Sequence, residues 1–307
     1  MYFIGFDIGG TKCAVSLGGV CQGGIELMGR EETPTLDDPV KTLEALSPFV
    51  EKWTKEYAVR RAGISCGGPL DSQRGVIIST PNLSSGWHGF EISNYVESRF
   101  GLKGKLENDA NASALAEWQF GAGRGYKNIV FMTFGTGLGA GLILDGRLYS
   151  GTNGNAGEIG HVRLEKDGPV GYNKAGSAEG FCSGGGIKRL AELRASEKGI
   201  ALAPDVTTKT IFEKAKQGDD FFLSVVKESA EKFARVVSIL IDLFNPEVIV
   251  VGGVFMRNYQ LFMEYMTPIL QAESLGDSYR VCRILSAEIG ENIGDYAALA
   301  IAVTEDQ

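Results

Sequence analysis

Three polar side chains, Asn108, Asp109 and Asn111, fall within four positions of the segment LENDANASALAEWQF. Apolar residues with the spacing of an amphipathic helix follow them, so the polar cluster lies where a strand gives way to a helix. Asn108 is a favourable N-cap, and Asp109 in the first turn suits the helix dipole, which should lower its pKa. The same carboxylate could take a proton from an alcohol as a general base. The residues alone support helix capping and catalysis about equally.

A first glycine turn, Gly9-Gly10, follows an apolar strand at residues 2–8, and KCAVSL begins a second strand. Glycine supplies the positive φ that such hairpin turns need. A purely structural hairpin does not need an acid at the strand end or a hydroxyl and an amine after the bend. A phosphate site does, because backbone N–H groups and a hydroxyl bind the anion while a carboxylate reaches Mg²⁺, directly or through water. The candidate ligands are Asp7, Gly9, Gly10, Thr11 and Lys12.

Two further glycine turns follow buried strands. The strand at residues 129–134 runs into FGTGLGAG and re-enters a strand, which excludes a dinucleotide fold because that fold needs a helix at this point. The third turn, in VVGGV, lies between a strand and a helix, where glycines let a flat ligand approach the backbone. The three turns together predict a nucleotide site, whose further candidates are Gly135, Thr136, Gly137, Gly252 and Gly253.

Composition bounds the class of protein. The 307 residues are enough for two domains, since domains usually hold about 100–200 residues each. A net charge of −8 argues against nucleic acid or an anionic membrane as a partner. The five cysteines show no CxxC spacing, and the N-terminus has no secretory signal, so we expect a cytoplasmic protein with reduced thiols.

The motifs GFDIGGTK, ENDANA, FGTGLGAG, GEIGH and VVGGV occur in the order and spacing of the ROK family of sugar kinases and repressors. The chain resembles this family over about residues 3–303. The resemblance implies an actin-like, ribonuclease-H-like ATPase fold of α/β class, with two lobes around a cleft and usually a homodimer. The final helix, near IGDYAALAIAV, would return to the first lobe. The expected lobes are residues 1–119 with 292–307, and residues 120–291.

The resemblance also implies roles for individual residues. Asp109 matches the catalytic base, and the adjacent Asn108 matches a sugar ligand. Carboxylates and other polar groups suit sugar recognition because they pair with adjacent hydroxyls. The other sugar-side positions that match are Gly68, Asn82, Glu158, His161 and Glu179.

One segment departs from the family pattern. Many members bind a structural zinc ion with three cysteines and a histidine after the GEIGH motif. The three cysteine positions here hold Val170, Tyr172 and Ser177, which leaves His161 and, outside the motif, Cys182. A structural zinc site needs four ligands, so we predict no zinc, with the loop held by packing of Val170 and Tyr172.

The resemblance favours an ATP- and Mg²⁺-dependent kinase acting on the 6-hydroxyl of a hexose, most simply glucose. An N-acetylhexosamine such as N-acetylmannosamine or N-acetylglucosamine is the main alternative acceptor, and fructose, allose and β-glucosides stay open. A sugar-binding regulator without turnover and an actin-like ATPase without a sugar are alternatives of other classes. Family repressors carry a winged-helix domain before the first glycine turn, and this turn begins at residue 9, so we expect catalysis.

Overall fold

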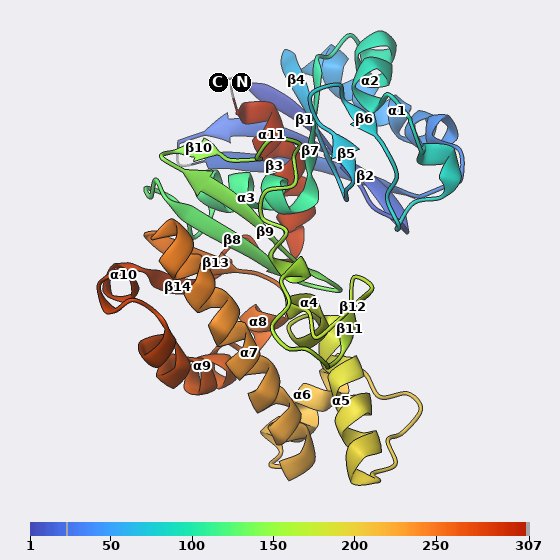
Figure 1. Cartoon of the computed structure of the whole chain (residues 1–307). Coiled ribbons are helices and arrows are strands. Elements are labelled where there is room, and N and C mark those ends of the chain that lie inside the picture. The colour runs from blue at the N-terminus through green and yellow to red at the C-terminus, as the bar shows by residue number, and fades with distance from the viewer. Residues whose placement is uncertain (23, 305–307) are drawn as a thin grey trace. The chain divides into compact units, whose positions relative to one another are not determined.

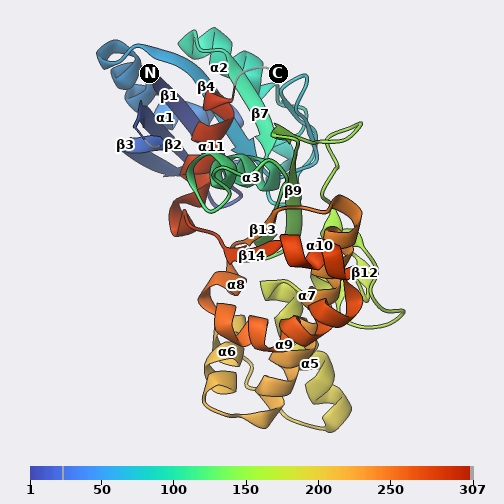
Figure 2. The same cartoon turned by 90° about the vertical axis from the view of Figure 1, so that its left-hand side faces the viewer.

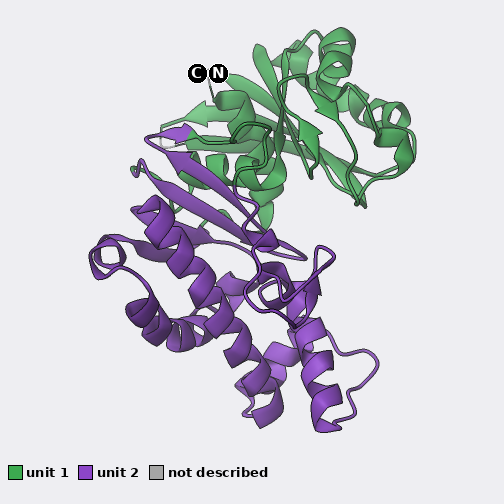
Figure 3. Ribbon diagram, in the orientation of Figure 1, with its two compact units in different colours: residues 1–125, 148–156, 288–307 green, residues 126–147, 157–287 purple. Residues whose placement is uncertain are grey.

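The structure is a computed structural model that describes residues 1–22 and 24–304 (Figure 1). The chain forms two compact units, coloured separately in Figure 3. Unit 1 comprises residues 1–125, 148–156 and 288–307, and unit 2 comprises residues 126–147 and 157–287. The division expected from the sequence, with boundaries at 119/120 and 291/292, stays a proposal.

Unit 1 is built on a five-stranded sheet in the order β3-β2-β1-β4-β7. The central strand β1 pairs antiparallel with β2 and parallel with β4, and β4 pairs parallel with β7. The strands are β1 (Tyr2–Ile8), β2 (Lys12–Cys21), β3 (Gly24–Pro34), β4 (Val59–Cys66) and β7 (Gly104–Asn108), with a small hairpin of β5 (Leu70–Asp71) and β6 (Val76–Ile77). The helices are α1 (Pro39–Glu56), α2 (Ile92–Phe100), α3 (Asp109–Phe120) and α11 (Ile293–Val303), with 3-10 turns η1 (Ser85–Trp87) and η3 (Gly290–Asn292).

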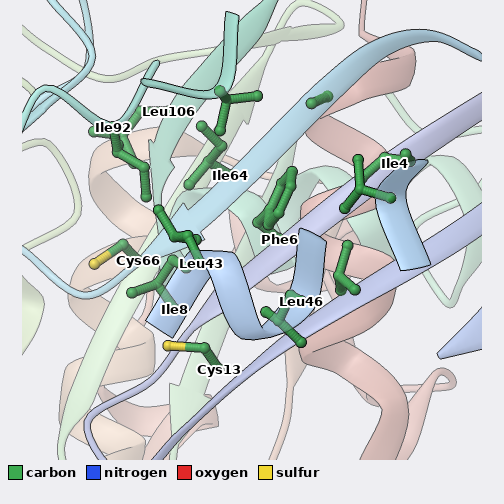
Figure 4. Close-up of a cluster of buried hydrophobic side chains, with 14 of the residues drawn as sticks. Ile4, Phe6, Ile8, Cys13, Leu43, Leu46, Ile64, Cys66, Ile92 and Leu106 are labelled. Carbon is green, nitrogen blue, oxygen red and sulfur yellow. The ribbon is translucent and has the colours of Figure 1, made fainter. Parts of the chain in front are cut away.

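Strand β1 has two different faces, because successive side chains of a strand point to opposite sides. Ile4, Phe6 and Ile8 lie in a buried cluster with side chains of α1, α2 and β4 (Figure 4). Phe3 belongs to a second cluster that includes Leu299 of α11. Asp7 has the parity of Phe3, so its side chain lies on the α11 face.

Helix α11 packs closely on this second face. A side chain at Gly63 of β4 would overlap the carbonyl oxygen of Ala298, and a Cβ at Gly5 of β1 would lie 2.8 Å from the Cβ of Ala298. Glycine at both positions therefore allows the helix to approach the sheet. The expected return of the final helix to the first unit is confirmed.

Helix α3 begins at Asp109 as expected, but the expectation of an amphipathic helix is wrong. All seven residues 110–112 and 114–117 are buried, polar and apolar alike, because α11, β3, β4 and β7 contact the helix. The buried polar residues include Asn111, whose amide donates to Glu107 Oε1 at 3.0 Å. Asn111 is therefore a structural residue of the core.

Glu117 of α3 is fully buried, and its carboxylate binds three backbone N–H groups. Oε2 accepts from Ala122 at 2.8 Å and from Glu288 at 3.2 Å, and Oε1 accepts from Ile289 at 2.9 Å. One carboxylate thus holds the loop after α3 and the segment before α11, which are far apart in the sequence.

Unit 2 is built on a sheet in the order β10-β9-β8-β13-β14, in which β8 pairs antiparallel with β9 and parallel with β13. Its strands are β8 (Ile129–Phe134), β9 (Leu138–Leu144), β10 (Arg147–Leu148), β13 (Val248–Val251) and β14 (Arg283–Ser286), with a hairpin of β11 (Val170–Gly171) and β12 (Lys174–Ala175). The helices, shown from a second side in Figure 2, are α4 (Ala178–Phe181), α5 (Gly184–Lys198), α6 (Thr208–Lys216), α7 (Asp220–Phe244), α8 (Val254–Arg257), α9 (Tyr259–Glu273) and α10 (Gly276–Val281), with the 3-10 turn η2 (Ile159–His161).

The strand–turn–strand units expected from the glycine motifs are confirmed in both sheets. β1 and β2 flank the first turn, β8 and β9 flank the second, and the third lies between β13 and α8. Asp145 and Gly146 both have positive φ, 52° and 74°, as a tight reversal requires. Within residues 1–22 and 24–304, none of the helices combines the length and apolar character needed to span a bilayer.

Candidate functional site

The carboxyl ends of three parallel strands of unit 1 lie side by side. Ile8 of β1 is paired with Cys66 of β4, which is paired with Asn108 of β7. The residues that directly follow these three are Gly9, Gly67 and Asp109. Ligands of open α/β sheets bind at such carboxyl ends.

Asp109 stands at this edge with one carboxylate oxygen available. The Ala110 N–H donates to both Asn108 Oδ1, at 2.9 Å, and Asp109 Oδ1, at 2.8 Å, so the expected N-cap by Asn108 is confirmed. Asp109 Oδ2 accepts no hydrogen bond from the described residues, and it would lie 3.8 Å from a Cβ at Gly67. Asn108 in turn has its amide nitrogen beside Gly68, where a Cβ would lie 3.3 Å from it.

The expectation that the helix dipole lowers the pKa of Asp109 is wrong, because the pKa is raised. Loss of hydration around the carboxylate is the main cause, and the Ala110 N–H acts in the opposite direction. Asp109 is nevertheless exposed to solvent on part of its surface. The direction of the shift fits a carboxylate in a recess that is open on one side, and it makes Asp109 a stronger base than an ordinary aspartate.

Asp7 and Asp295 are two acidic residues on the α11 face of the unit 1 sheet. Asp295 is buried and accepts from Ser16 Oγ at 2.5 Å and from Arg30 Nε at 2.8 Å. Gly294 makes room for the Asp7 carboxylate, since any side chain there would overlap it. Asp7 itself has no hydrogen bond or ion pair among the described residues.

Burial raises the pKa of Asp7 to about 6, and the charges of Asp295 and Asp109 add to the shift. An unpaired carboxylate in a negative environment, with oxygen as its only ligand atom, fits a hard cation such as Mg²⁺. Among the described residues, no three His, Cys, Asp or Glu side chains are grouped to hold a metal ion. Asp7 would therefore supply one ligand to an ion whose other ligands come from water and a bound phosphate.

The first glycine turn lies against the loop that carries Asn82. A side chain at Gly10 would overlap the Asn82 carbonyl oxygen, while the Gly9 N–H closes the turn on the Lys12 carbonyl at 3.1 Å. Thr11 is exposed at the bend. Lys12 is also exposed, but it forms a salt bridge of 2.8 Å with Glu32, which partly compensates its charge.

In unit 2, three glycine segments meet. A side chain at Gly253 would overlap the Phe134 carbonyl oxygen and would lie 3.3 Å from the Gly135 nitrogen, so the second and third turns touch. The Gly184 N–H at the start of α5 donates to the Gly135 carbonyl at 2.8 Å. The second and third glycine turns were expected from the sequence. The glycine run at the start of α5, Gly184–Gly186, was not, although it is visible in the sequence.

Glu179 links the second turn to the η2 segment. Its Oε2 accepts from the Leu138 N–H at 3.1 Å and would lie 2.6 Å from a Cβ at Gly137. Its Cβ would lie 3.4 Å from a Cβ at Gly160 of η2, the turn that Glu158 precedes and that ends at His161. The three candidate sugar ligands of unit 2 are therefore brought to one region.

The loop that replaces the zinc motif is held by other contacts. Ser177 is buried, donates to the Gly171 carbonyl at 3.0 Å and accepts from Gly180 at 3.1 Å. The ring of Tyr172 lies edge-on to His161, with 4.9 Å between centroids. The expectation that packing of Val170 and Tyr172 holds the loop is wrong, since these side chains are 49% and 52% exposed.

Cys182, the remaining thiol near the loop, is fully buried. Its Sγ donates to the Ser229 carbonyl at 3.7 Å, and burial raises the pKa of the thiol. The absence of a zinc site stays a prediction.

The sequence analysis also missed Arg30, Ser16 and Asp295. Asp295 is the single acidic residue of the apolar segment IGDYAALAIAV, and a buried charge in such a segment is a signal of a partner or a site. Its partners could not be found from sequence because they lie on strands more than 260 positions away.

Comparison with known proteins supports the resemblance to the ROK family. The glucokinase of Streptomyces coelicolor is 31% identical over 315 residues, covering 99% of this chain and 98% of that protein. The bifunctional enzyme NanE/NanK of Brucella melitensis is 30% identical, covering 98% and 54%, and the xylose repressor of Caldicellulosiruptor bescii is 26% identical, covering 88% and 70%.

Among solved structures, the ROK glucokinase of Streptomyces griseus, in complex with glucose and AMPPNP, superposes with a TM-score of 0.77. It is 30% identical, and the match covers 98% of this chain and 99% of that one. The expected fold class is thereby confirmed: the two α/β units have the two-lobed actin-like ATPase fold. The ROK family model matches residues 3–305, so the chain belongs to the ROK family.

Proposed function

We propose that this protein is an ATP-dependent kinase that phosphorylates the 6-hydroxyl of a hexose, most simply glucose. The observation that carries the proposal is Asp109, a carboxylate of raised pKa whose Oδ2 is free at the in-register ends of β1, β4 and β7. A regulator that only binds sugar has no need of such a base. The S. griseus glucokinase, which binds glucose and AMPPNP, supports the choice of substrates.

In this mechanism Asp109 accepts the proton of the sugar hydroxyl as its oxygen approaches the γ-phosphorus. Asn108, Gly68 and Asn82 would orient the sugar from unit 1. Glu158, His161 and Glu179 would do so from unit 2. Phosphoryl transfer needs alignment and charge neutralisation more than covalent chemistry, so these groups act by positioning.

The nucleotide would be held by the glycine turns of both units. In unit 1 these residues are Gly9, Gly10, Thr11 and Lys12, and in unit 2 they are Gly135, Thr136, Gly137, Gly252 and Gly253. Asp7 would hold Mg²⁺, in part through water, and the ion would neutralise charge on the phosphates. Ser16 and Arg30 hold Asp295, whose charge helps to keep a cation-binding potential at Asp7.

A coupled ADP-release assay over glucose, fructose, allose, N-acetylglucosamine, N-acetylmannosamine and a β-glucoside tests the proposal. We expect turnover with glucose to exceed that with the other sugars. Turnover only with an N-acetylhexosamine would favour the second candidate, in line with the similarity to NanE/NanK. Sugar binding without ADP release would favour a regulator, and ADP release without any sugar would favour a plain ATPase. A homodimer, also proposed, is tested by light scattering on the same sample.

We expect kcat to fall as the pH is lowered toward the pKa of Asp109. The pKa of Asp109 lies above the usual carboxyl value, and the base works only when deprotonated, so activity is present above this pKa and is lost below it. Mg²⁺ held by Asp7 would keep that carboxylate ionised, so the acid limb would report Asp109. Initial rates at saturating sugar and MgATP measure the profile. A rate that rises toward pH 5 would contradict the assignment.

Removal of divalent metal ions tests the predicted absence of zinc. We expect EDTA to abolish activity and Mg²⁺ alone to restore it fully, because Ser177 and the β11–β12 hairpin hold the loop without metal. The unfolding temperature should not change with EDTA. Recovery that requires added zinc would show that the loop does bind the ion.

A further inference from the structure

The start of α5 is a run of glycines whose first N–H groups are already bonded. Gly184 donates to the Gly135 carbonyl at 2.8 Å, and Gly185 donates to the Thr136 carbonyl at 3.3 Å. Gly186 donates to Ser183 Oγ at 2.8 Å. These donors fix the helix to the second glycine turn, and none of the three is available to an anion.

The guanidinium of Arg189 lies over this run, one turn into the helix. A Cβ built on Gly185 would lie 3.1 Å from Arg189 Nη1 and 3.3 Å from the Thr136 carbonyl oxygen. The guanidinium and the second glycine turn therefore flank the same glycine. A Cβ at position 185 would require the Arg189 guanidinium to shift by a few tenths of an ångström.

Arg189 has no hydrogen bond or ion pair with any described residue, and its Nε is buried without an acceptor. Arg194, on the same helix, forms salt bridges with Glu228 at 2.6 Å and with Glu197 at 2.8 Å. An unpaired buried N–H of a cation is costly, and such groups usually have a partner. A guanidinium binds anionic oxygens in a fork geometry, so an anion from outside the chain would supply the partner that Arg189 lacks.

Two backbone N–H groups of the second glycine turn also lack an acceptor among the described residues. The Gly135 N–H bonds to Gly137, and the Leu138 N–H bonds to Glu179. In the described part of the chain, the N–H groups of Thr136 and Gly137 appear in no such bond. Successive free N–H groups in a turn form an anion-binding concavity.

We infer that Arg189 is a ligand of the phosphate chain of the nucleotide, acting with the N–H groups of Thr136 and Gly137. The inference rests on the proposed kinase function. It assigns to unit 2 a cation that the glycine motifs do not contain, and it makes Arg189 the residue that favours a nucleoside di- or triphosphate over a nucleoside.

Calorimetric titration of the wild type, Arg189→Ala and Arg189→Lys with MgADP, AMP and adenosine tests the inference. We expect Arg189→Ala to raise the Kd for MgADP and the KM for MgATP by about 10–100-fold, the range for loss of a charged hydrogen bond. The Kd for adenosine and the KM for the sugar should stay within about twofold, a change too small to count as a lost contact. Arg189→Lys should lie between the wild type and Arg189→Ala, because it keeps the charge without the fork.

The matched control is Lys188→Ala, which removes the neighbouring cation of α5. The Lys188 side chain is 44% exposed and its ammonium lies 3.8 Å from Glu192, so it should leave every constant unchanged. An unchanged Kd for MgADP in Arg189→Ala would overturn the inference. An equal loss of affinity for adenosine would also overturn it, because the contact would then be to the base or the fold.

Thermal unfolding of each variant separates a folding defect from a lost contact. If Arg189→Ala does not fold, Arg189→Lys decides, since equal MgADP affinity in that variant and the wild type would reject the fork contact. The proposed function is judged separately by wild-type turnover. Wild-type turnover with an unchanged Arg189→Ala would reject only the inference, and absent wild-type turnover would reject the function.

Discussion

Asp109→Asn lowers kcat for sugar phosphorylation by about 10²–10⁴-fold, the usual contribution of a general base. The amide has nearly the same shape but cannot accept the hydroxyl proton. Ala110 keeps its acceptor on Asn108, so the helix start is retained and the KM for the sugar should change little. The coupled ADP-release assay measures both constants.

Glu97→Gln is the control for this substitution, since Glu97 is an exposed carboxylate of α2 in the same unit. It should leave kcat unchanged. Equal kcat in the wild type and Asp109→Asn would remove Asp109 from the mechanism. A loss seen only as a higher KM would make it a sugar ligand instead of a base.

Glu117→Ala should cause the largest loss of stability that we expect from a single substitution. Three partly buried N–H donors, on Ala122, Glu288 and Ile289, lose their acceptor. A buried donor left without a partner costs about 1–3 kcal/mol, and partial burial puts each of these near the lower end, so the free energy of unfolding should fall by about 4 kcal/mol. Glu117→Gln should cost less, because one acceptor oxygen remains.

Urea unfolding followed by far-UV circular dichroism measures this loss as a lower midpoint. Glu97→Ala, an exposed position on α2, serves as the control and should shift the midpoint little. A midpoint for Glu117→Ala equal to that of the wild type would show that water or other acceptors satisfy the three donors.

The features predicted correctly from sequence are local ones. Gly9-Gly10, Asp145-Gly146 and Gly252-Gly253 mark real turns, because a glycine or a short polar residue at a bend reflects the backbone at that point. The cap by Asn108 depends only on the next two residues. The resemblance to the family added the two-lobed fold class, which is confirmed.

The features that sequence reasoning missed depend on packing between distant segments. The pKa of Asp109 moves upward because loss of hydration outweighs the local N–H that argued for a lower value. Asp295 is bonded to Ser16 and Arg30, which lie on strands far away in the sequence, and Arg189 and Thr136 both lie close to Gly185. None of these contacts follows from spacing along the chain.

The pairing of Ile8, Cys66 and Asn108 has a consequence for how acceptor preference can change. Main-chain ladder bonds hold Asn108, so they fix where the backbone of the next residue, Asp109, begins. Asn82 and the residues after Gly67 lie in connections outside that ladder. If the proposed kinase function holds, exchanging those connections between family members should therefore change the preferred carbohydrate and leave Asp109 in place.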